Sequence, residues 1–121
     1  MFKTKGFTRA ARRVRITDVA LCVAIGEVMR GQADSLGGGV WKKGLGQNRE
    51  RAIILAKGDR RWVYEFLFSK QNREGISDAE LAGFRQLAAV YATLQETAIA
   101  AMLTNGDWTE ICHDSEIKVQ K

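Results

Sequence analysis

The chain is poor in the residues that build metal centres. Its 121 residues include two cysteines and one histidine. Cys22 and Cys112 are far apart, lack the spacing of metal ligands, and have no second Cys/His cluster beside them, so we expect no metal site. Cys22 falls in an apolar helical segment and is expected to be a small buried residue. Nothing in the sequence accounts for the absence of proline.

Long apolar runs are also missing. No segment approaches the ~18 apolar residues that a membrane helix needs, and no apolar stretch follows Met1–Lys5 as in a signal peptide. We therefore expect a cytoplasmic protein with reduced thiols and no membrane partner. Hydrophobic residues still make up 45% of the chain, which is enough for one core. A single domain over residues 1–121 is expected, with 114–121 as a loose tail.

Acidic residues are scarce in the first part of the chain. Residues 1–73 carry 16 Lys and Arg against 6 Asp and Glu, whereas residues 74–121 carry 3 against 8. A cationic body joined to an acidic end favours a polyanionic partner, and nucleic acid is the simplest one. The reason is that clustered Lys and Arg side chains attract phosphates.

The middle of the chain has the pattern of antiparallel strands. Glu50–Lys57 and Arg61–Lys70 are rich in β-branched, aromatic and aliphatic residues, and Gly58–Arg60 between them predicts a short hairpin loop. Three glycines open Leu36–Lys43 and precede the start of a strand, and Gly44–Asn48 resembles a turn. Shorter strands are expected at Phe2–Lys5 and Trp108–His113.

Helices flank these strands. Asp18–Arg30 has apolar residues at three- and four-residue spacing with Thr17 as its N-cap, and Phe7–Val14 has the composition of a short basic helix. Two capping boxes, Ser77–Glu80 and Thr93–Glu96, predict the starts of two more helices. Runs of strands beside runs of helices predict an α+β fold rather than a parallel α/β sheet.

Candidate phosphate-binding residues lie on the strand Arg49–Leu55. Strand alternation places Arg49 and Arg51 on the same face as two aliphatic residues. Arginine suits phosphate because its planar fork binds the group bidentately and keeps its charge. The simpler alternative is a solvated strand end at which both arginines point to water.

Further cations follow neighbouring segments. Lys70 and Arg73 lie at the exit of the long apolar strand, where they are expected to converge with Arg51. Lys42 and Lys43 come after the glycine run, which either allows close approach to a ligand or simply forms a turn.

Two other side chains are weaker candidates. Tyr64 is either a core residue or a group that stacks a base or transfers a proton. His113 is the only histidine, and its place near the acidic end makes it a poor catalytic candidate.

An ordered series of short motifs runs along the chain: F-K-T-K, I-x-D-x-x-L, L-G-G-G-V-x-K-K, R-A-I-x-L, F-S-K-x-x-R-x-x-I, D-x-E-L and E-I-C-x-D. The series resembles the RelE/ParE superfamily over about residues 2–114. It is most similar to the HigB-like, phage-associated branch of toxins from type II toxin–antitoxin operons. The resemblance implies a small RelE-like α+β fold, with an antiparallel sheet of about four strands packed with helices.

The resemblance also implies an activity and partners. Toxins of this kind are mRNA interferases, endoribonucleases that cut mRNA on the ribosome without a metal or cofactor and so inhibit translation. The implied protein partner is a helix-turn-helix antitoxin, with operator DNA bound only through that antitoxin.

Roles for individual residues follow from the matching motifs. Arg51 matches the family's strand arginine, Lys70 the lysine after the next strand, and Arg73 the arginine beyond it, so these three are the predicted catalytic residues. The predicted RNA-binding residues are Lys42, Lys43, Arg49 and Tyr64. The chain departs from the family pattern at Gly44, where relatives often have Arg, at Gly75, where Asn is common, and in a shorter loop over residues 44–48.

The implied reaction needs no metal. The RNA 2′-hydroxyl attacks the adjacent phosphorus and leaves a 2′,3′-cyclic phosphate, which requires a base, charge stabilisation and an acid for the leaving 5′-oxygen. Because the chain has no usable histidine, Lys70 is the candidate base. Arg51 would stabilise the transition state, and Arg73 would do likewise or act on the leaving group.

Two other functions are compatible with the same basic face. One is a ParE-like toxin that poisons DNA gyrase without cutting RNA. The other is a non-catalytic nucleic-acid-binding or regulatory protein that uses the cations only to contact phosphates.

Overall fold

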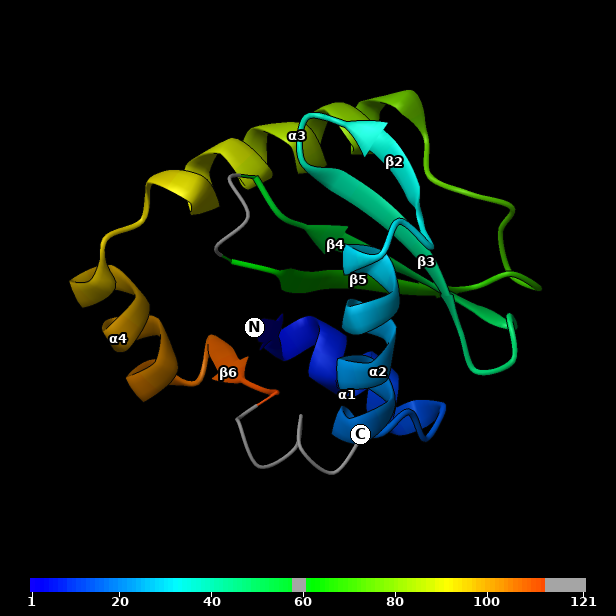
Figure 1. Cartoon of the computed structure of the whole chain (residues 1–121), viewed down its shortest axis with the longest axis horizontal. Coiled ribbons are helices and arrows are strands. Elements are labelled where there is room, and N and C mark those ends of the chain that lie inside the picture. The colour runs from blue at the N-terminus through cyan, green and yellow to red at the C-terminus, as the bar shows by residue number, and fades with distance from the viewer. Residues whose placement is uncertain (58–60, 113–121) are drawn as a thin grey trace.

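In the computed structural model, which describes residues 1–57 and 61–112, helices pack against a mixed sheet (Figure 1). This confirms the predicted α+β class. The described elements are, in chain order, β1 (Phe2–Thr4), α1 (Lys5–Arg13), α2 (Asp18–Met29), β2 (Asp34–Gly37), β3 (Val40–Leu45), β4 (Glu50–Leu55), β5 (Val63–Ser69), α3 (Asp78–Thr93), α4 (Glu96–Asn105) and β6 (Trp108–Glu110).

The sheet is wider than the sequence predicts. Within the described residues it has six strands in the order β2-β3-β4-β5-β1-β6. The centre is antiparallel as predicted, with β3 paired to β4 and β4 to β5. However, β1 lies parallel to β5, so the sheet is mixed. Strand β2 was not predicted, because a four-residue strand ending in glycine has too little alternation to detect.

Strand β4 is covered on both faces. Ala52 and Ile54 belong to the apolar cluster that holds α1 and α2, whereas Ile53 and Leu55 belong to the cluster under α3. All four side chains are at most 1% exposed. Arg51, the one cation of this strand, therefore lies near its start, before the covered residues, and Arg49 directly precedes the strand.

The predicted helix starts are mostly confirmed. Thr17 accepts a hydrogen bond from the amide of Ala20, and Ser77 forms the complete capping box with Glu80. The box at Thr93 is wrong. Thr93 is the last residue of α3, its hydroxyl donates to the Val90 carbonyl, and α4 begins after Gln95 without a side-chain cap. A Ser/Thr-x-x-Glu spacing also arises by chance at a helix end.

The glycine run forms the β2–β3 turn rather than a ligand cradle. Gly37, Gly38 and Gly39 all have positive φ, which side chains adopt with strain. A Cβ on Gly38 would lie 2.8 Å from the Cγ of Arg85, and Arg85 donates hydrogen bonds to the carbonyls of Leu36 and Gly37. The glycines thus let the turn pack under α3.

The prediction of reduced thiols is wrong in this structure. Cys22 of α2 and Cys112, which follows β6, form a disulfide with their Cα atoms 5.4 Å apart. Cys22 is buried, as expected. The sequence separation of 90 residues concealed the pair, because only the tertiary fold brings the end of β6 against α2.

None of the described helices is by itself long and apolar enough to cross a membrane. α3 and α4 would meet the length and composition together, but the chain bends by 113° between them. The Gly58–Arg60 loop, His113 and the expected tail 114–121 lie outside the described residues.

Candidate active site

The cations predicted to bind RNA meet where β3 turns into β4. A hollow of about 390 Å³, here called the Arg51 hollow, lies beside this turn. It is lined by Gln32, Ala33, Asp34, Lys42, Lys43, Gly44, Asn48 and Arg51. Its lining is therefore mostly polar, which suits a charged group better than an apolar ligand.

Arg51 is held in place by backbone carbonyls. Its Nη1 donates to the carbonyl of Asn48 at 2.7 Å and to that of Glu50 at 3.3 Å. Across the ladder Arg51 pairs with Gly44, which has no side chain to cover the guanidinium. The glycine at position 44 thus leaves the floor of the Arg51 hollow open.

Asn48 is a site residue that the sequence analysis missed. Gly46, Gln47 and Asn48 all have positive φ, and this left-handed turn presents the Asn48 carbonyl to Arg51. A Cβ on Gly44 would come within 2.2 Å of Asn48 Oδ1, so the missing side chain also makes room for Asn48. The detectable signal was the G-x-N turn, because asparagine tolerates the left-handed region better than most residues.

Lys70 lies at the same end of the sheet. Its amide donates to the Arg49 carbonyl at 3.0 Å, which extends the β4–β5 ladder by one pair beyond Glu50 and Ser69. Arg51 pairs with Phe68, so Lys70 is its diagonal neighbour, a separation of roughly 7–8 Å that long side chains can bridge. A second hollow, the Lys70 hollow, is lined by Gln47, Asn48, Arg49, Glu50, Ser69, Lys70 and Gln71.

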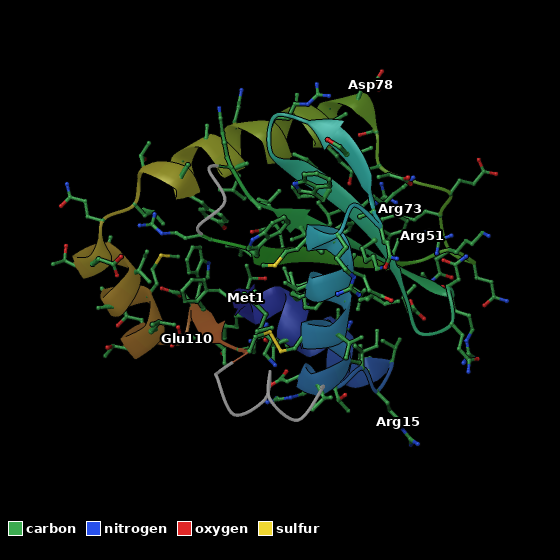
Figure 2. All side chains as sticks on the ribbon, viewed as in Figure 1. Met1, Arg15, Arg51, Arg73, Asp78 and Glu110 are labelled. Atoms are coloured by element: carbon green, nitrogen blue, oxygen red, sulfur yellow. A yellow bond between two sulfur atoms is a disulfide. The ribbon has the colours of Figure 1, made fainter. Side chains whose placement is uncertain are left out.

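Arg73 is brought to the same region but is already engaged. Its guanidinium carbon lies 5.5 Å from the centre of the Phe68 ring, and Phe68 is the ladder partner of Arg51. Figure 2 shows Arg73 and Arg51 at the same end of the sheet. Its Nε donates to the Gly75 carbonyl at 2.8 Å, and an Nη donates to Glu80. These bonds position the side chain, and the Glu80 carboxylate offsets part of its charge.

The hydrogen bond from Arg73 and a further one from the Ser77 amide lower the pKa of Glu80 from 4.5 to about 2. An acid with a depressed pKa in the folded state contributes stability above its unfolded pKa, and this contribution is lost as the pH falls toward 2. We therefore expect Glu80→Gln to lower the urea midpoint at pH 6 and to have little effect near pH 2. The measurement is urea denaturation of both proteins across this range. An equal decrease of the urea midpoint at both pH values would show that the Arg73–Glu80 pair does not titrate as described.

The two lysines of β3 behave differently from each other. Lys43 is tied into the fold: its Nζ lies 3.1 Å from a carboxylate oxygen of Glu27 and donates to the Gln32 carbonyl at 3.0 Å. Lys42 lines the Arg51 hollow and forms none of the ion pairs found among the described residues. Lys42 is therefore the better placed of the two to contact a phosphate.

Tyr64 is a core residue. Its side chain is 0% exposed and its hydroxyl donates to the Leu21 carbonyl at 2.6 Å. Burial raises the pKa of this hydroxyl well above its ordinary value. The prediction that Tyr64 contacts RNA is therefore wrong, because no face of the buried ring is open to stack a base. The alternative, a core residue, is the one found.

Four predicted cations take part in none of the ion pairs of the described structure, although Asp34 also lines the Arg51 hollow. Lys42, Arg49, Arg51 and Lys70 form no ion pair within residues 1–57 and 61–112, whereas Lys3, Lys43, Arg61 and Arg73 each have one. In the same ranges no group of three His, Cys, Asp or Glu side chains is placed to hold a metal ion. The arrangement can bind a phosphate chain and place Lys70 beside it.

Comparison with known proteins identifies the family. The family model of the RelE toxin of the RelE/RelB toxin–antitoxin system matches residues 1–111. Neither a search of curated proteins nor a search of solved structures gave a significant match. The family match covers the sheet and the four helices of the described residues, together with every candidate site residue. The chain therefore belongs to the RelE toxin family.

Proposed function

We propose that this toxin is a metal-independent mRNA endonuclease of the HigB-like branch, which cuts translated mRNA on cytoplasmic ribosomes. Family membership supports a toxin with an antitoxin partner, which we propose to be a helix-turn-helix protein. The observation that carries the proposal is the set of cations around the β3–β4 turn that form no ion pair with a described residue: Lys42, Arg49, Arg51 and Lys70.

The proposed chemistry assigns each cation a task. The RNA 2′-oxygen bonds to the adjacent phosphorus, the bond from phosphorus to the 5′-oxygen breaks, and the products are a 2′,3′-cyclic phosphate and a 5′-hydroxyl. Lys70 accepts the proton of the 2′-hydroxyl, Arg51 stabilises the charge that develops on the phosphoryl oxygens, and the leaving 5′-oxygen takes its proton from a water molecule. Arg73, which Glu80 and Phe68 hold beside Arg51, adds positive potential rather than a proton.

Inducible expression with primer extension on a reporter mRNA tests this function. We expect growth arrest together with new 5′ ends inside the coding region. A matched reporter without a start codon should stay intact, because the ribosome supplies part of the site geometry. Growth arrest with an intact translated reporter would instead favour a gyrase poison.

Binding of single-stranded RNA should depend steeply on salt. Each phosphate contact made by Lys or Arg releases counterions, with a slope of about 0.7 in log affinity against log salt. Four contacts would give a slope of roughly 3, or a loss of about 60-fold between 50 and 200 mM salt. Fluorescence anisotropy with a labelled oligonucleotide measures it, and an affinity that does not change over this range would exclude the electrostatic footprint.

A further inference from the structure

A third hollow, the α2 hollow, lies on the other side of the β3–β4 turn. It has a volume of about 630 Å³ and lies between α2, the α1–α2 connection and the turn. Its lining is Val14, Arg15, Ile16, Thr17, Ala20, Val23, Ala24, Glu27, Gly44, Leu45, Gly46, Gln47, Asn48 and Arg49. The proposed chemistry uses none of its apolar residues.

Exposed hydrophobic side chains gather at this place. Of the five large hydrophobic residues that are exposed in the described structure, Val14 and Val23 line the α2 hollow. Val19 lies one helical turn before Val23 on α2. The three valines are 40%, 43% and 48% exposed for Val14, Val23 and Val19, respectively. Exposed apolar side chains that gather in this way mark a site of protein interaction.

The rim of the α2 hollow is cationic. Arg15 extends away from the body of the molecule (Figure 2), and Arg49 also lines the hollow. Neither forms an ion pair among the described residues, nor do Arg12 and Arg13 in the last turn of α1. The acidic lining residue Glu27 is already paired with Lys43. Among the described residues, these arginines therefore have no carboxylate with which they form an ion pair.

The shape favours a helix as the occupant. The α2 residues that line the hollow run from Ala20 to Glu27, about two turns or roughly 10 Å. Helices that dock in grooves present apolar residues at i, i+3, i+4 and i+7, which cover this length. RNA fits less well, because its phosphates would bind only the cationic rim and would leave the exposed valines uncovered.

We propose that the α2 hollow is the docking site for an acidic amphipathic helix of the antitoxin. Its apolar side packs on Val14 and Val23, and its carboxylates face Arg15 and Arg49. The α2 hollow shares Gln47, Asn48 and Arg49 with the Lys70 hollow, so the occupant contacts the same turn that holds Arg51. That the docked helix inhibits mRNA cleavage rests on the proposed function, whereas the docking itself does not.

The test is an NMR titration of the full-length protein with a synthetic peptide. The peptide carries leucine at i, i+3, i+4 and i+7 and glutamate on its other face, and a scrambled peptide of identical composition is the control. We expect the first peptide to shift the amides of Val14, Val23 and the β3–β4 turn, and the scrambled peptide to bind more weakly. Shifts confined to other surfaces, or equal binding of both peptides, would overturn the proposal.

Matched variants separate this face from general charge effects. Val23→Glu should weaken peptide binding by about tenfold or more, because like charges across an interface repel. Val90→Glu makes the same change at a side chain that is 54% exposed on α3, and it should change binding less than about twofold. Equal effects of the two variants would contradict the assignment.

Two further readouts separate a docking surface from a catalytic or RNA-binding one. Val23→Glu should still arrest growth, since the residue is outside the proposed catalytic group. A folded Val23→Glu protein that no longer arrests growth would place the hollow on the catalytic surface and overturn the proposal. A single-stranded RNA oligonucleotide that shifts Val14 and Val23 would make RNA the occupant. If the wild-type protein fails to cut mRNA, the proposed function fails while the peptide result stands.

Discussion

Replacing Arg51 with alanine is expected to slow mRNA cleavage by about 100- to 1000-fold, the usual scale for loss of one electrostatic donor to a transition state. The guanidinium is held by the Asn48 and Glu50 carbonyls and lines an open hollow, so its removal takes away a placed charge. The fold should survive, because Arg51 is only partly buried and forms no ion pair with a described residue. Circular dichroism and single-turnover cleavage on programmed ribosomes measure the two effects.

Lys70→Ala should cause a loss of similar size, because the proposed proton acceptor is removed. Lys57→Ala is the matched control: Lys57 is also exposed, but it follows the opposite end of β4, and its replacement should leave the rate unchanged.

Arg51→Lys keeps the charge but loses the planar fork, and we expect it to recover only part of the activity. If Arg51→Ala and Lys70→Ala both remain fully toxic, these residues belong to a solvated basic face and not to a catalytic site.

Reducing the Cys22–Cys112 disulfide is expected to lower the free energy of unfolding by about 4–5 kcal/mol. The bond closes a loop with a sequence separation of 90 residues, and the loss of loop entropy in the unfolded chain scales with the length of that loop. The total stability of a small domain is about 5–15 kcal/mol, so the change is a large fraction of it. Urea denaturation with and without reductant measures the difference.

A double variant isolates the bond from other effects of the reductant. Cys22→Ala combined with Cys112→Ser should have the stability of the reduced wild type and should not respond to reductant. Alanine suits position 22 because that side chain is buried in the cluster between α2 and the sheet. Equal stability of the oxidised and reduced wild type would show that the end of β6 is held against α2 without the covalent bond. In a reducing cytoplasm the weaker, dithiol form would be the working state.

Much of the site could be located from the sequence because its residues lie on or beside two strands that are neighbours along the chain. The hairpin that pairs β4 with β5 was predicted from two apolar runs, and its register carries Lys70 to Arg49. The convergence of Arg51, Lys70 and Arg73 at one end of the sheet follows from that pairing. What the pattern did not reveal is the partner of each cation. Glu80 was recognised as a capping residue, but its bond to Arg73 depends on how the 71–76 connection folds back.

The pairing of the short strands and the distant contacts needed the tertiary structure. Short strands were expected near β1 and β6, but β2, with four residues, is too short for a periodic signal, and all three form strands because a neighbouring strand offers hydrogen bonds. The alternating pattern of the strand around Tyr64 would be the same whether that face of the sheet were open or covered. Only the packing of α1 and α2 decides that it is buried.

The sequence by itself determined the α+β class, the long helices, the central hairpin and the cationic body. These are properties of local propensity, periodicity and composition, which each segment carries on its own. The family was indicated separately, by the resemblance of the ordered motif series. The tertiary structure alone decided the parallel pairing of β1 with β5, the bond between Cys22 and Cys112, and which of the described cations form ion pairs. Each of these depends on segments far apart in the chain, whose meeting is set by the burial of apolar faces and not by any local pattern.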